Sequence, residues 1–169
     1  MSAFEKSGVE RDVPGALVRP PPAREFPGRP AHHTPGWVKS GATFHLRFRC
    51  APDFNQSLTA TTLATEVLAA VRHYHKTARW YAHLFLLMPD HAHALLVFPP
   101  DAAMSTVIGA WKSYLVRAHG VRWQPNYFDH RIRHDGEFAE KWHYIRRNPV
   151  AKNLCAHEDD WPWIWMPSD

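Results

Sequence analysis

A switch between two hydrophobic periodicities, repeated along the chain, constrains the fold more than any other feature of the sequence. Alternation of apolar and polar residues over 43–50 predicts a half-buried strand. Apolar residues at helical spacing over 59–77 predict an amphipathic helix. Two further apolar runs, 80–88 and 91–98, are separated by a two-residue break, so together they predict a β-hairpin.

The second half of the chain continues this pattern. Residues 103–119 carry apolar side chains at helical spacing, and 127–132 have the composition of a last short strand. Residues 136–148 indicate a final helix, which we expect Pro149 to end. The order strand, helix, strand, strand, helix, strand is that of the split βαβ, ferredoxin-like sandwich. We therefore predict an α+β fold with a central antiparallel sheet and one extra C-terminal helix.

The first part of the chain has a different composition. Residues 1–36 hold seven of the 15 prolines and almost no apolar periodicity. Because proline excludes helix and removes backbone donors, we expect a disordered or extended arm here. One folded domain, 37–169, is expected to follow.

Cysteine content and charge narrow the protein class. The two cysteines form no C-x-x-C pair, which argues against a disulfide framework and a structural zinc site. No apolar run approaches the roughly 20 residues that cross a bilayer, and the N-terminus does not resemble a secretory signal. We therefore expect a cytoplasmic protein that makes no membrane contact. The net charge of +4 is weak support for a polyanionic partner.

The first candidate for chemistry is the pair His91 and His93. In a strand, residues two apart point to the same face, so both imidazoles can converge on one divalent ion. His73 and His75 have the same spacing, but on a predicted helix, where such residues do not face each other. The alternative interpretation is two histidines on one sheet face, satisfied by hydrogen bonds.

The second candidate is Tyr144, with Asn148 four residues later on the same face of the predicted helix. A phenol can attack phosphorus and form a covalent intermediate. An amide oxygen is a plausible hard ligand for Mg²⁺ or Mn²⁺. The alternative is a surface helix whose tyrosine packs on the sheet edge.

Basic residues interleaved with aromatic residues are the third feature. Between residues 112 and 152 the chain has nine Lys or Arg against four Asp or Glu, with two tryptophans among them. Such a mixture suits single-stranded DNA, whose phosphates need neutralising and whose bases stack on aromatic rings. A basic surface over an aromatic core is an equally good interpretation.

Taken together, these segments resemble one known family. Residues 88–93, MPDHAH, resemble the M-P-x-H-x-H signature of the HUH superfamily of single-strand endonucleases. Residues 144–150, YIRRNPV, are similar to the Y-I-x-x-N-P-V of single-tyrosine transposases associated with repetitive extragenic palindromes. The segments 123–130 and 160–163 resemble the same family, and the resemblance covers roughly 37–165.

The resemblance implies a metal-dependent, single-stranded DNA endonuclease and strand transferase that acts on hairpin DNA. His91 and His93 would bind Mg²⁺ or Mn²⁺, with Asn148 as a third ligand. Tyr144 would attack the scissile phosphate and leave a 5′-phosphotyrosine and a free 3′-OH, and the protein would act as a monomer or homodimer. Candidates for DNA contact are Lys112, Trp123, Arg131, Arg133, Arg146 and Arg147, and candidate helpers are His130 and His143.

Three other functions stay open at this stage. One is a domesticated, non-catalytic hairpin-binding protein that keeps the fold. Another is a replication or mobilisation initiator of the same superfamily. The third, a metal-dependent hydrolase, lacks an additional strong acidic ligand at matching spacing.

Overall fold

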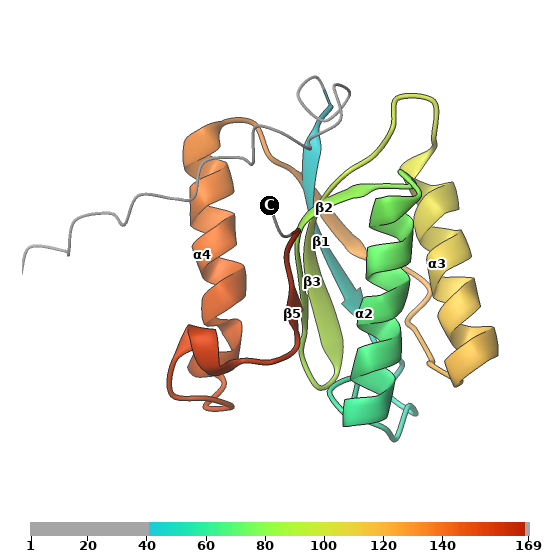
Figure 1. The fold of residues 1–169 in the computed structure, drawn as a ribbon, viewed down its shortest axis with the longest axis vertical. Coiled ribbons are helices and arrows are strands. Elements are labelled where there is room, and N and C mark those ends of the chain that lie inside the picture. Colours follow the sequence, from blue (N-terminus) through green and yellow to red (C-terminus); the bar gives the residue numbers. More distant parts are fainter. Residues whose placement is uncertain (1–40, 168–169) are drawn as a thin grey trace, which may run out of the picture.

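The structure is a computed structural model that describes residues 41–167 (Figure 1). The expected arm, 1–36, and its boundary at residue 37 lie outside the described residues. In chain order the elements are β1 (Thr43–Arg49), α2 (Thr61–Lys76), β2 (Tyr81–Leu87), β3 (His91–Val97), α3 (Met104–His119), β4 (Phe128–Arg131), α4 (Asp135–Ala151), the 3-10 turn η1 (Glu158–Asp160) and β5 (Ile164–Trp165). The predicted order is therefore confirmed from β1 to α4, whereas η1 and the edge strand β5 were not predicted.

Five strands form one sheet in the order β4-β1-β3-β2-β5, and every neighbouring pair is antiparallel. Strand β3, which carries the histidine pair, lies in the middle of the sheet, and every residue of it is buried. The hairpin between β2 and β3 closes with a hydrogen bond from the Met88 amide to the His91 carbonyl at 2.8 Å. The sequence break at 89–90 is therefore a turn, as predicted.

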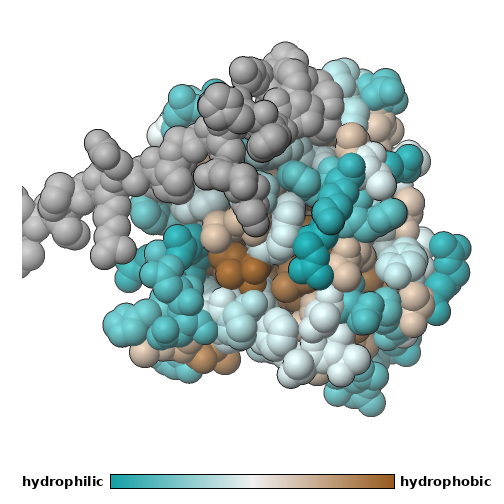
Figure 2. Space-filling model, viewed as in Figure 1, coloured by the Kyte–Doolittle hydropathy of each residue, from teal (hydrophilic) through white to brown (hydrophobic). Residues whose placement is uncertain are grey.

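Helices cover both faces of the sheet (Figure 1). Helices α2 and α3 pack on one face over the larger core, which includes Phe48, Phe85 and Trp111. Helix α4 packs on the other face, over a smaller core that contains Leu84 and Leu95. Seen from the same side, apolar side chains gather between these helical layers, and hydrophilic side chains cover the helices (Figure 2).

One stripe of helix α4 holds it against the sheet. Ile145 is fully buried, and Phe138 and Trp142 pack against the same core at helical spacing. The His134 side chain caps the N-terminus by accepting a hydrogen bond from the Glu137 amide at 3.1 Å. No helix among residues 41–167 is long and apolar enough to cross a membrane.

The expected end of this helix before Pro149 is wrong, since α4 continues to Ala151. Pro149 lacks an amide hydrogen and so cannot bond to the Ile145 carbonyl. Its ring is buried, however, and the last turn is closed by the amides of Lys152 and Leu154, which donate to the Asn148 and Pro149 carbonyls. These contacts offset the one missing bond so close to the helix end.

Candidate functional site

Alternation along β1 and β3 builds one polar face in the middle of the sheet. The antiparallel register places Arg47 opposite His93 and Arg49 opposite His91. The intervening residues of both strands belong to the core under α2 and α3. The histidines and arginines therefore point to the other face, toward α4.

The imidazoles of His91 and His93 converge, with their Nε2 atoms 3.2 Å apart. The Asp90 carboxylate accepts a hydrogen bond from His91 Nδ1 at 2.6 Å. On the other side, His93 Nδ1 lies 3.1 Å from His45 Nε2. The four side chains form one hydrogen-bonded chain in the order Asp90, His91, His93, His45.

Burial keeps these imidazoles neutral. Desolvation, helped by the nearby His91 and His45, lowers the pKa of His93 to about 2. Desolvation also lowers the pKa of His45 to about 4, with a smaller contribution from Lys141. The pKa of His91 is lowered by burial, although the Asp90 hydrogen bond opposes this. Neutral imidazole is the form that binds a metal.

Tyr144 lies over the histidines on α4. Its side chain is 50% exposed, and its ring centroid is 5.8 Å from that of His93 and 6.0 Å from that of His45. The structure therefore brings the tyrosine and the histidine pair together. Asn148 follows one turn later, and its Nδ2 donates to the Tyr144 carbonyl at 2.8 Å. That bond engages the amide nitrogen rather than the oxygen that a metal would need.

Two adjoining cavities, of about 340 and 410 Å³, separate α4 from the sheet. Both are lined by Arg47, His93 and Tyr144, and we call them together the histidine cleft. Lys141 lines the smaller cavity, and Asn148 lines the larger one. Cations outnumber carboxylates along the walls, so the cleft suits a phosphate.

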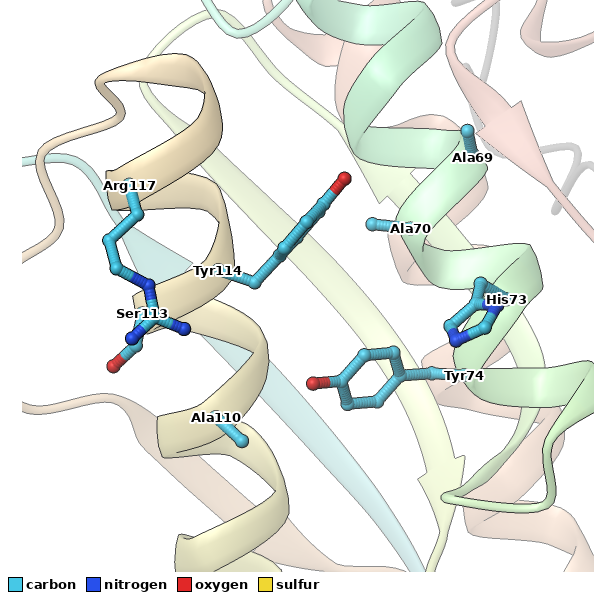
Figure 3. A pocket seen from close by; sticks show the side chains of 8 residues that line it. All are labelled: Ala69, Ala70, His73, Tyr74, Ala110, Ser113, Tyr114 and Arg117. Atoms are coloured by element: carbon cyan, nitrogen blue, oxygen red, sulfur yellow. The ribbon is translucent and has the colours of Figure 1, made fainter.

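A larger cavity, of about 830 Å³, lies between α2 and α3, on the other side of the sheet (Figure 3). Tyr74 from α2 and Tyr114 from α3 point into it, and His73 lies at its edge. His75 turns elsewhere and accepts a hydrogen bond from the Ala82 amide at 3.2 Å. The second His-x-His motif therefore does not converge, as the helical spacing predicted.

Several residues that were expected to contact DNA instead contact other residues of the protein. Lys112 Nζ donates to the Gln124 carbonyl at 2.6 Å, on the α3 side of the sheet. The Trp123 ring packs on Trp111, with centroids 5.5 Å apart. These two residues therefore lie away from the histidine cleft.

The candidate arginines between β4 and the end of α4 differ in their contacts. Arg146 forms ion pairs with Glu158 and Asp159 in η1. Arg133, in the loop before α4, and Arg147, on α4, are exposed. Arg131 is exposed too, but it lies opposite Phe44, which packs on the core under α2 and α3, so its side chain points away from the cleft. Of the two candidate helpers, His130 lines the cleft and pairs with Glu137 at 2.5 Å, whereas His143 is exposed on α4.

Sequence reasoning missed His45, Arg47, Asp90 and Lys141. Every second residue of 43–50 is polar, and this signal indicated only a half-buried strand. It could also have indicated a functional face, because β1 pairs directly with the histidine strand. Asp90 was visible only as a turn residue.

The chemistry of this donor set fits a divalent cation. Two neutral imidazoles direct Nε2 atoms toward one point, and Asn148 and Asp90 line the same cavity. Among residues 41–167, no cluster of three His, Cys, Asp or Glu side chains is arranged around a metal position. An ion held here would therefore need amide, water or phosphate oxygens in addition to the two histidines.

No protein-family model matches the chain. A REP-associated tyrosine transposase of Escherichia coli (strain K12) is 28% identical over 88 residues, which cover 50% of this chain and 53% of that protein. A solved structure of a REP-associated tyrosine transposase bound to a REP hairpin is similar over 73% of this chain and 76% of the other, with a TM-score of 0.65 and 23% identity. The chain is therefore similar to REP-associated tyrosine transposases in part of its sequence and in its fold. The structural similarity confirms the predicted α+β fold, and the sequence match spans about half the length of the curated relative.

Proposed function

We propose that the chain is a metal-dependent, single-stranded DNA endonuclease and strand transferase whose nucleophile is Tyr144. The observation that carries this proposal is the 5.8 Å between the Tyr144 and His93 rings, with His91 Nε2 and His93 Nε2 converging beneath. A scissile phosphate must touch nucleophile and metal together, and this cleft lets it do so. Hairpin DNA is the proposed substrate, because a solved REP-associated tyrosine transposase of similar fold is bound to a REP hairpin.

His91 and His93 would hold Mg²⁺ or Mn²⁺ through Nε2. Asn148 would add its amide oxygen after its side chain turns away from the Tyr144 carbonyl. A bound divalent ion would polarise the scissile phosphate and stabilise the departing 3′ oxygen. Asp90 fixes the His91 ring through Nδ1, as carboxylates commonly do for metal-binding histidines.

The chain's own groups would supply the nucleophile and its surroundings. The Tyr144 phenol would form the new bond to phosphorus as the bond from phosphorus to the 3′ oxygen breaks, and the leaving oxygen would take up a proton. Lys141 lies one turn earlier on α4 and lines the same cavity, so its charge favours a developing phenolate. A 3′-OH that attacks the phosphotyrosine reverses the reaction and joins strands.

Phosphate contacts would come from the side of the molecule that carries the cleft. Arg47 lines both cavities, and the exposed Arg133 and Arg147 lie in the loop before α4 and on α4. Phosphate neutralisation dominates affinity for nucleic acid and makes it depend on salt.

A cleavage assay tests this function. Labelled single strands copied from the DNA on both sides of the gene are incubated with the protein and Mg²⁺ or Mn²⁺, then resolved on a denaturing gel. We expect cleavage by the wild type and by Tyr114→Phe, a tyrosine on α3 far from the cleft, but not by Tyr144→Phe. Tight hairpin binding without cleavage under either metal would instead indicate a non-catalytic hairpin-binding protein.

A further inference from the structure

Hydrogen bonds link the side chains of Asp90, His91, His93 and His45 in that order. The Asp90 end of this series determines which atom donates in every bond. A carboxylate only accepts, so His91 Nδ1 is the donor to Asp90 and the neutral ring has a lone pair on Nε2. His93 Nε2 lies 3.2 Å from His91 Nε2 and must donate to it, since two nitrogen lone pairs that face each other at this distance repel. His93 Nδ1 is then an acceptor, and His45 Nε2 donates to it at 3.1 Å.

The proposed metal site requires the opposite arrangement at His93. Both Nε2 atoms must be unprotonated to act as ligands. The His91 ring already meets this condition, because Asp90 holds its proton on Nδ1. His93 must move its proton from Nε2 to Nδ1, and Nδ1 then needs an acceptor in a site where the residue is 2% exposed.

We propose that His45 is a positioning residue that reverses this one hydrogen bond, donating to His93 Nδ1 in the metal-free protein and accepting from it when the metal site is filled. This inference rests on the metal site of the proposed function. When the hydrogen bond reverses, the ring proton of His93 moves from Nε2 to Nδ1, and so does the ring proton of His45. Each ring keeps one proton, so no proton is gained or lost overall.

The structure holds His45 where it can do this. In the β1–β3 register His45 pairs with Leu95, so it is a diagonal neighbour of His93, within reach of its ring. The rings of Phe128 and Tyr144 pack on it at 5.7 and 6.0 Å, and only 6% of the residue is exposed. Bulk water is therefore excluded as the partner of His93, and an imidazole can serve both as donor and as acceptor.

Nuclear magnetic resonance of the full chain, labelled with ¹⁵N at histidine, reads the tautomers directly. Above neutral pH in EDTA we expect His93 with its proton on Nε2, and in saturating Mg²⁺ with its proton on Nδ1; His45 should change in the same way. Signals are assigned by single His→Gln substitutions. A His93 tautomer that is the same with and without Mg²⁺ would overturn the proposal.

Substitution of His45 provides the second test, with Mn²⁺ binding followed by electron paramagnetic resonance. His45→Phe can neither donate nor accept, so Mn²⁺ affinity should fall about 10- to 100-fold, as for other residues that orient metal ligands. His45→Gln keeps an amide that can do either, so it should restore most of the affinity. The control is His75→Phe, another histidine packed between aromatic rings but on α2, which should bind Mn²⁺ as the wild type does.

The results of these experiments distinguish a failure of the proposed metal site from a failure of the proposed role of His45. If the wild type binds Mn²⁺ and His45→Phe binds it equally well, the role of His45 is wrong and the metal site stands. If the wild type binds no Mn²⁺, the metal site and the role of His45 both fail. If His45→Phe does not fold, the Mn²⁺ affinity of His45→Gln and the histidine tautomers of the wild type still test the role of His45.

Discussion

Lowering the pH of the metal-free protein from about 7.5 to about 5 should destabilise the fold strongly. His45 and His93 are 6% and 2% exposed, and burial lowers their pKa values from 6.5 to about 4 and about 2. Below pH 6.5 the unfolded chain takes up protons at both sites, and the folded chain does not. The free energy of unfolding is therefore highest above that pH, and it decreases as the pH falls below it.

The size of the effect follows from the two shifts. One pKa unit corresponds to about 1.4 kcal/mol, and pH 5 lies about 1.5 units below the unfolded value, so each histidine costs about 2 kcal/mol. Together His45 and His93 should lower the free energy of unfolding by about 4 kcal/mol. That is a large share of the roughly 5–15 kcal/mol that stabilises a typical domain.

Urea unfolding in EDTA, followed by tryptophan fluorescence, measures this loss at the two pH values. The control is the double variant His45→Gln/His93→Gln, which should lose about 4 kcal/mol less over the same range. A free energy of unfolding that is unchanged between the two pH values would refute the reasoning. An equal loss in the double variant would do the same, since the acid sensitivity would then come from other groups.

Three further outcomes are expected. His93→Ala should abolish cleavage and leave hairpin affinity nearly unchanged in a filter-binding assay, because phosphate contacts supply most of the affinity; equal loss of both would indicate a structural role. Arg147→Gln should weaken hairpin binding and reduce the slope of log affinity against log salt by about one, whereas Arg117→Gln in the cavity of α2 and α3 should not. Ile145→Ala should lower the free energy of unfolding by about 2–5 kcal/mol in urea titrations, because a fully buried side chain leaves a hole under α4; a loss below 1 kcal/mol would contradict that packing.

Local patterns were enough to predict most of the fold. Period-two alternation and helical spacing reflect which face of each element is buried, so they predicted the element order directly. The hairpin break at 89–90 placed the histidine strand beside its neighbour, and the spacing of His91 and His93 placed both on one face. These inferences needed no information about distant contacts.

Features that depend on tertiary contacts were not predictable in this way. The hydrogen bond from His45 to His93 joins residues 48 positions apart, and its existence depends on the strand register. Lys112 was expected to contact phosphate because it is basic, but its ammonium donates a hydrogen bond to the Gln124 carbonyl of a nearby loop. Pro149 looked like a helix end because burial of its ring is invisible to a local rule.

The covalent intermediate tests the central claim most directly. The wild-type protein is incubated with Mn²⁺ and a cleavable single-stranded hairpin, the adduct is trapped and digested, and the DNA-linked peptide is sequenced by mass spectrometry. We predict that the DNA is attached to Tyr144 through a 5′-phosphate and that Tyr144→Phe, which removes one oxygen and little packing, gives no adduct while still binding the hairpin. A linked peptide that excludes Tyr144, or an adduct that persists in Tyr144→Phe, would contradict the assignment of the nucleophile.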